Sequence, residues 1–199
     1  MHRVLIAVQV VAALTVTAQA ETVNVAVAAN FTDAANEIAA AFADATEHDA
    51  VLSFGATGQF YAQITQGAPF QVFLAADDER PALAVQEGYG VDGTVFTYAI
   101  GQLVLYAAEA GTVTGPETLE EGDFQQIAIA NPETAPYGAA AVETMKALNV
   151  YDSLTSKIVQ GQNIAQTYQF VETGNAEVGF VALGQVGLQA FETVAGDGF

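Results

Sequence analysis

Residues 22–42, TVNVAVAANFTDAANEIAAAF, most restrict what this chain can fold into. Val23 to Ala29 is an apolar run rich in β-branched residues, which is typical of a buried strand. A turn at residues 30–33 follows, and apolar residues then recur at the spacing of an amphipathic helix. The first N–H groups of such a helix have no partner inside it, and they lie at the positive end of its dipole. The stretch therefore predicts a place where an anion can bind.

The same unit recurs along the chain and predicts an α/β fold with two lobes. Alternating strands and helices favour mostly parallel sheets flanked by helices. We predict lobe 1 at residues 21–97 and lobe 2 at residues 98–199. Strands are expected at residues 50–54, 71–75, 101–107, 127–130, 157–159 and 178–182. Helices are expected to end near residues 67 and 88 and to span residues 139–148, 164–173 and 185–190, with a loop at 149–156. Residues 111–122 are polar and contain Pro116.

The first twenty residues have the pattern of a secretory signal peptide. A short polar region with Arg3 precedes the apolar residues 4–16, and residues 18–20 fit a small-x-small cleavage site. We expect cleavage after Ala20 and a mature protein in the periplasm, without a membrane span. The alternative is an N-terminal anchor helix, but the apolar run is shorter than the about 20 residues that cross a bilayer.

Composition excludes several classes of partner and site. The chain carries 4 Lys and Arg against 23 Asp and Glu, a net charge of −19, which disfavours nucleic acid and anionic membrane surfaces. It has no cysteine, so disulfides and thiolate metal sites are excluded. The two histidines, His2 and His48, form no cluster with a nucleophile or metal ligands, and Ser53 lies in a predicted strand with no base nearby. These features favour binding over catalysis.

Four turns are candidate binding elements, at residues 30–32, 55–58, 135–138 and 161–164. Each follows a predicted strand and opens a predicted helix, and ligands of open α/β sheets lie beyond the carboxyl ends of the strands. Two turns from each lobe could therefore meet in one cleft. They offer an amide, hydroxyls and backbone N–H groups but no Lys or Arg, which suits reversible binding of a fully ionised oxyanion. Taken singly, each turn residue is explained more simply as a helix cap, as surface packing or by turn geometry.

One acid lies close to these turns. Asp33 is one turn into the first predicted helix, where a carboxylate lining the pocket would repel an anion. A negative charge near a helix N-terminus is also favourable by itself. We therefore expect Asp33 to face solvent.

Five segments carry a resemblance to a known family. They are VAVAANFTDAANEIAAAF, LSFGATGQFYAQITQGAPFQVFLAADDE, GQLVLYAA, IAIANPETAPYGAAAVETMKALNVYDSL and NIAQTYQFVETGNAEVGFVAL. With them the chain resembles the periplasmic molybdate-binding proteins of ABC transporters. The resemblance implies a periplasmic-binding-protein-like fold whose two α/β lobes close over one tetrahedral oxyanion. It further implies a monomeric, non-enzymatic protein without cofactor that delivers molybdate, and also tungstate, to an inner-membrane permease.

The resemblance implies four ligand-binding residues. Asn30 matches a polar ligand after the first strand, and Thr57 matches a serine or threonine ligand. Tyr137 occupies the contact position of the Pro-Tyr-Gly turn, and Ile164 an apolar position whose backbone N–H binds the anion. Molybdate would be held as an oxyanion without direct metal ligands. Some members carry their tyrosine at the position of Ala182 and a small residue at that of Tyr137; here the pattern is reversed, so Tyr137 is expected to supply the hydroxyl.

The end of the chain departs from the family pattern, and other functions stay open. Members usually continue with a strand and a helix that return to lobe 1, whereas this sequence ends at Phe199. We expect that the return segment is absent or that the sequence is a fragment, which would leave lobe 1 incompletely covered. The alternative ligand is sulfate or another small oxyanion. Different classes of function are an exported hydrolase and an adhesion or structural domain.

Overall fold

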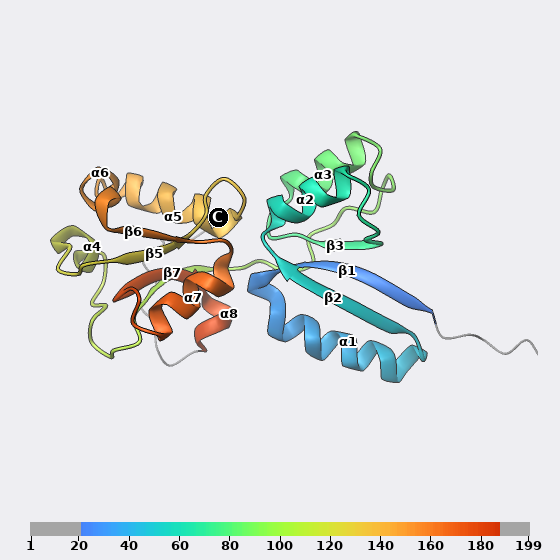
Figure 1. Cartoon of the computed structure of the whole chain (residues 1–199), viewed down its shortest axis with the longest axis horizontal. Helices are drawn as coiled ribbons and strands as arrows, with labels where there is room; N and C mark the ends of the chain where they lie inside the picture. The colour runs from blue at the N-terminus through green and yellow to red at the C-terminus, as the bar shows by residue number, and fades with distance from the viewer. Residues whose placement is uncertain (1–20, 188–199) are drawn as a thin grey trace, which may run out of the picture.

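The chain forms two α/β lobes, each built on its own sheet (Figure 1). The computed structural model describes residues 21–187, so the interpretations of residues 1–20 and of residues 188–199 lie outside the described residues. One sheet has three strands in the order β2-β1-β3, and the other has four in the order β4-β7-β5-β6. Within residues 21–187 no helix is both long enough and apolar enough to cross a membrane.

Lobe 1 is a parallel sheet between helices. Both outer strands pair in parallel with β1, whose buried valines Val25 and Val27 pack against Ala35 of the first helix. Helix α1 covers one face of the sheet, and α2 and α3 lie on the other (Figure 1). Its elements are β1 (Thr22–Ala28), the 3-10 turn η1 (Ala29–Phe31), α1 (Thr32–Thr46), β2 (Asp49–Gly55), α2 (Thr57–Thr65), β3 (Val72–Leu74) and α3 (Glu79–Gln86).

Lobe 2 has a mixed sheet. Strand β5 pairs in parallel with β6 and β7, and β4 pairs antiparallel with β7. Buried residues of α5, such as Met145, pack on one face of the sheet, and Val171 of α7 packs on the other. Its elements are β4 (Leu103–Tyr106), α4 (Glu117–Glu121), β5 (Ile127–Ala130), α5 (Pro136–Ala147), α6 (Tyr151–Leu154), the 3-10 turn η2 (Thr155–Lys157), β6 (Ile158–Gly161), α7 (Ile164–Glu172), β7 (Val178–Ala182) and α8 (Leu183–Val186).

A long extended segment joins the two lobes. Residues 94–102 contain neither helix nor strand, and the predicted lobe boundary at residues 97 and 98 falls within them. Tyr98 fixes the segment to lobe 1, because its hydroxyl donates a hydrogen bond to the Ala75 carbonyl (2.8 Å) and its ring packs edge-on against Phe31. Apolar side chains nearby are exposed, with Phe96 at 77% and Ile100 at 79%.

The predicted fold class is confirmed, and several element boundaries are corrected. The strands at residues 127–130 and 178–182 have the predicted bounds. Helix α5 begins at Pro136 rather than at residue 139, because proline is well suited to the first helical position. The loop expected at residues 149–156 is wrong in part, since it contains α6, and the polar stretch at residues 111–122 contains α4. Each is only about one turn long, so the sequence pattern of a helix is too short to recognise.

Candidate functional site

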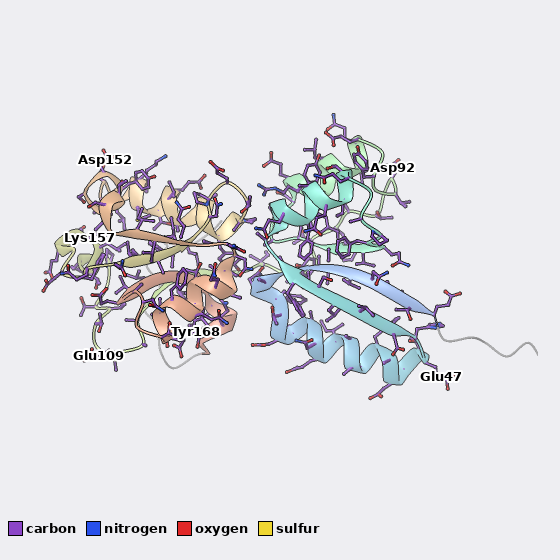
Figure 2. The ribbon with its side chains drawn as sticks, viewed as in Figure 1. Glu47, Asp92, Glu109, Asp152, Lys157 and Tyr168 are labelled. Atoms are coloured by element: carbon purple, nitrogen blue, oxygen red, sulfur yellow. The ribbon has the colours of Figure 1, made fainter. Side chains whose placement is uncertain are left out.

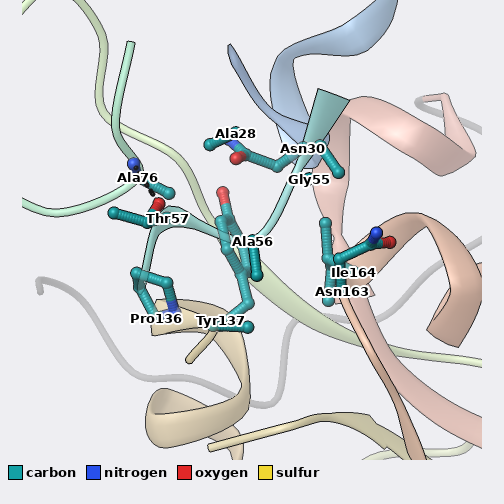
Figure 3. A pocket seen from close by; sticks show the side chains of 12 residues that line it. Ala28, Asn30, Gly55, Ala56, Thr57, Ala76, Pro136, Tyr137, Asn163 and Ile164 are labelled. Atoms are coloured by element: carbon teal, nitrogen blue, oxygen red, sulfur yellow. Dashed lines mark hydrogen bonds between the residues drawn. The ribbon is translucent and has the colours of Figure 1, made fainter. Parts of the chain in front are cut away.

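The four predicted binding turns meet at one pocket between the lobes (Figure 3). Each turn lies at the carboxyl end of a strand and opens a helix, and lobe 1 faces lobe 2 across the pocket. All four predicted ligand residues line it. The full lining is Ala28, Ala29, Asn30, Gly55, Ala56, Thr57, Ala76, Ala135, Pro136, Tyr137, Asn163 and Ile164.

Small side chains allow the lobes to approach each other here. Ala29 and Ala56 of lobe 1 form one buried cluster with Ala130, Ala135 and Ile164 of lobe 2. The two helices that begin at Thr57 and Pro136 have alanine at the cap position, so no side chain caps their first N–H groups. Unpartnered N–H groups at a helix start can bind a ligand instead.

The lobe 1 side of the pocket offers a hydroxyl and an amide. Thr57 is fully buried, and its Oγ1 accepts a hydrogen bond from the Ala76 N–H (3.0 Å). Because that oxygen already accepts, the hydroxyl proton remains available to donate to a ligand. Asn30 lies in η1, half-buried, and it does not cap α1, whose cap residue is Phe31.

The lobe 2 side offers a second hydroxyl and a helix start. Tyr137 reaches up from α5 with its hydroxyl towards Asn30 (Figure 3). Burial raises the pKa of Tyr137, while the neighbouring Asn30 side chain acts in the opposite direction. The phenol therefore stays protonated, and able to donate, at neutral pH. Asn163 caps α7 by accepting from the Gln166 N–H (3.0 Å), so its side chain does not cap the N–H of Ile164, the first residue of α7, which lines the pocket.

Charged groups lie outside this pocket. None of the twelve lining residues is charged, and Asp33 is exposed, as predicted. Arg80, the basic residue nearest in sequence to a lining residue of the pocket, pairs with Asp77. Lys157 donates to two backbone carbonyls in lobe 2. Among residues 21–187 no cluster of acids and histidines could hold a metal ion. Acids lie at the periphery in Figure 2, which labels Glu47, Asp92, Glu109 and Asp152.

The comparisons with known proteins agree with this architecture. Residues 23–196 match the family model described as bacterial extracellular solute-binding protein. The chain belongs to this family. The molybdate-binding protein ModA of Rhodobacter capsulatus is 52% identical to this chain, over 90% of this chain and 71% of that protein. The molybdate-binding protein ModA of Azotobacter vinelandii is 54% identical, over 85% of this chain and 68% of that protein. The structure of the Azotobacter vinelandii periplasmic molybdate-binding protein superposes with a TM-score of 0.81 at 37% identity, covering 87% of this chain and 77% of that one.

Sequence reasoning on this solute-binding protein did not identify Gly101, a residue that positions the Tyr137 side chain at the pocket. A Cβ atom at Gly101 would overlap the hydroxyl oxygen of Tyr137, so the glycine allows the phenol to lie against the segment between the lobes. The sequence placed Gly101 at the start of a strand, and nothing local linked it to a tyrosine 36 positions later. Ala182 is buried in the alanine cluster and does not line this pocket, whereas Tyr137 does.

Replacing Gly101 by alanine should displace the Tyr137 hydroxyl and weaken ligand binding. A lost hydrogen bond to a charged ligand costs about 1–3 kcal/mol. Titration calorimetry on Gly101→Ala, Tyr137→Phe and the double variant would test this. Because both changes remove one interaction, the double variant should bind no more weakly than Tyr137→Phe. Additive losses would show that Gly101 acts through something other than the phenol.

Proposed function

We propose that this solute-binding protein captures molybdate, and also tungstate, and delivers it to an ABC transporter permease at the inner membrane. The observation that carries the proposal is the pocket of neutral donors between two lobes, lined by no charged side chain. Relatives at 52% and 54% identity named for molybdate binding support the choice of ligand. In the proposed cycle a monomer in the periplasm closes its lobes over the anion, and the permease recognises the closed form.

Each proposed ligand residue supplies a donor. The Asn30 amide and the Thr57 hydroxyl would bind from lobe 1, and the Tyr137 hydroxyl and the Ile164 backbone N–H from lobe 2. A fully deprotonated oxyanion has only acceptor oxygens, so such a set satisfies it. Hydrogen bonds to a charged partner are stronger than neutral ones, and they do not need a lysine or arginine to compensate the charge. No bond of the ligand is made or broken.

Titration calorimetry of residues 21–199 with molybdate, tungstate and sulfate tests the proposal. We expect one-to-one binding of molybdate and tungstate and little response to sulfate, because the relatives at 52% and 54% identity are named for molybdate binding. A folded chain that binds none of the three would contradict the proposal. Circular dichroism on the same sample establishes that it is folded.

Sulfate is the alternative ligand. The sulfate-binding protein SubI of Mycobacterium tuberculosis shares the fold with a TM-score of 0.68, but at 12% identity it supports no choice of ligand. Stronger binding of sulfate than of molybdate in the same titration would select this alternative. Turnover of a generic ester substrate would instead support the exported hydrolase.

Association of the anion should become faster as salt is added. The chain carries a net charge of −19, which repels a dianion at long range. Salt screens this repulsion over about 8 Å at physiological ionic strength. Stopped-flow measurements of the association rate constant from low to physiological salt would check the sign. A rate constant that falls with salt would require a positive field around the pocket.

A further inference from the structure

Two hydrogen bonds join the lobes beside the pocket, outside its lining. The Gly58 N–H of lobe 1 donates to the Thr134 carbonyl of lobe 2 (2.8 Å). The guanidinium Nη2 of Arg80 donates to the Glu133 carbonyl (3.2 Å). None of these four residues lines the pocket, so these contacts act between the lobes rather than on the ligand.

The acceptor side is a tightly held turn. The Asn131 Oδ1 accepts from the Glu133 N–H (2.9 Å), and the Asn131 carbonyl accepts from the Ala135 N–H (2.8 Å). Asn131 itself is tied to β6, because its N–H donates to the Gly161 carbonyl (2.8 Å). Residues 131–135 therefore present the carbonyls of Glu133 and Thr134 to lobe 1 in a fixed orientation.

The donor side is fixed as well. Asp77 holds Arg80 twice, by accepting from its backbone N–H (3.0 Å) and by pairing with its guanidinium. Gly58 is the second residue of α2, and its N–H is one of those without a partner inside the helix. Thr134 of the other lobe satisfies that N–H group, so lobe 1 carries two oriented donors for two oriented acceptors.

The contact at Gly58 depends on the absence of a side chain. A Cβ atom there would lie 2.9 Å from the Thr134 carbonyl oxygen and 3.0 Å from the Thr134 Cα. Within lobe 1 the Cβ atom would lie 3.2 Å from the Arg80 Nε, which belongs to a flexible side chain. An added methyl group therefore conflicts mainly with the backbone of the other lobe, and helical backbone accepts alanine more readily than glycine.

We propose that Gly58, Arg80 and residues 131–135 form an interlobe latch that sets how long the closed protein retains its anion. The proposal rests on the proposed function, because it assumes that the lobes close on a ligand. A contact that forms only when the lobes meet stabilises the closed state and must break before the anion leaves. Its loss therefore acts on the dissociation rate constant more than on association. Gly58 and Arg80 are positioning residues that never touch the ligand.

Gly58→Ala gives the sharper test. We expect the ligand-free variant to melt at the wild-type temperature or above it, because alanine favours the helix. Molybdate should nevertheless dissociate at least tenfold faster, with association changed less than threefold. A merely structural role would lower the melting temperature instead. Gln63→Ala, an exposed substitution in the same helix, is the control and should change neither quantity.

Arg80→Met is the second variant, because it keeps an unbranched, flexible side chain and removes the guanidinium donor. Dissociation should become about three- to tenfold faster. Glu133→Gln is the matched control, since Arg80 contacts the carbonyl of that residue rather than its carboxylate. Dissociation rates equal to wild type in both Gly58→Ala and Arg80→Met would overturn the latch.

Measuring lobe closure in the absence of ligand tests this inference separately from the proposed function. Dyes on Gln86→Cys in lobe 1 and Glu143→Cys in lobe 2 report lobe closure by energy transfer, and the chain has no other cysteine. The latch predicts a smaller closed fraction in Gly58→Ala than in wild type. An equal closed fraction overturns the latch whatever the ligand. A wild-type chain that closes but binds no molybdate overturns the proposed function alone.

Discussion

Gly138→Ala is expected to destabilise lobe 2 by about 3 kcal/mol or more, at the upper end of the cost of overpacking. A Cβ atom at this position would overlap the carbonyl oxygen of Ala130, and it would lie 2.7 Å from the carbonyl carbon of Ala130 and 2.9 Å from that of Asn131. All three are backbone atoms, so no side chain can move aside. Relief requires α5 to shift away from the end of β5, which would also move Tyr137. The variant should therefore unfold earlier and bind ligand more weakly.

Urea unfolding followed by circular dichroism measures the loss of stability. Gly184→Ala is the matched control, because it is also a helical glycine and a Cβ there meets nothing closer than 4.0 Å. That control should change the free energy of unfolding by less than about 1 kcal/mol. If Gly138→Ala unfolded at the wild-type urea concentration, the close approach of α5 to β5 would be wrong.

Thr57→Val should weaken molybdate binding by about 1–3 kcal/mol, which is roughly 5- to 150-fold in affinity. Valine keeps the shape of this fully buried side chain and removes its hydroxyl. Two interactions are lost: the proposed donor to the anion and the acceptor of the Ala76 N–H. The variant should also lose some stability, since the Ala76 N–H is left without that acceptor.

Thr167→Val provides the comparison for Thr57→Val. Thr167 is equally buried and lies in the first turns of α7, but its hydroxyl donates to the Asn163 carbonyl (3.0 Å) rather than facing the pocket. This variant should lose stability and keep its affinity. Affinity that is unchanged in Thr57→Val, or reduced equally in both variants, would remove Thr57 from the proposed ligand set. Calorimetric titration and thermal melts on the same samples give both quantities.

The sequence predicted buried strands well, because a short run of apolar, β-branched residues favours a buried strand over a surface helix or a loop. Residues 127–130 and 178–182 are short apolar runs that each follow a polar residue, and both have the predicted bounds. The direction of β4 could not be predicted, since a buried strand of four apolar residues has the same pattern whether it pairs parallel or antiparallel. Direction follows from the path of the chain around it. Helices of one turn, such as α6, fall below the length at which periodicity can be recognised.

The sequence also predicted which turns would meet but not what holds them together. The four turns could be chosen because each follows a strand and opens a helix, and such positions gather at one edge of a sheet. Within those turns, Thr57 and Tyr137 were chosen from the family resemblance. The contacts of Gly58 with Thr134 and of Gly101 with Tyr137 join segments far apart in the chain, and no local pattern encodes them. Their roles, and those of the four ligand residues, stay predictions until binding is measured.

The alanines that meet between the lobes have a consequence for how this protein can change over time. Ala29 and Ala56 face Ala130 and Ala135, so a methyl group gained by one partner narrows the space left for the other. Larger residues there would keep the two lobes from packing together. Residue sizes at these positions should therefore be correlated between the two lobes. A larger residue in one lobe should occur together with a smaller residue at the facing position of the other lobe. Among natural variants, the fit between the lobes around the ligand would therefore limit which pairs of residues occur at facing positions, rather than which residue occurs at each position alone.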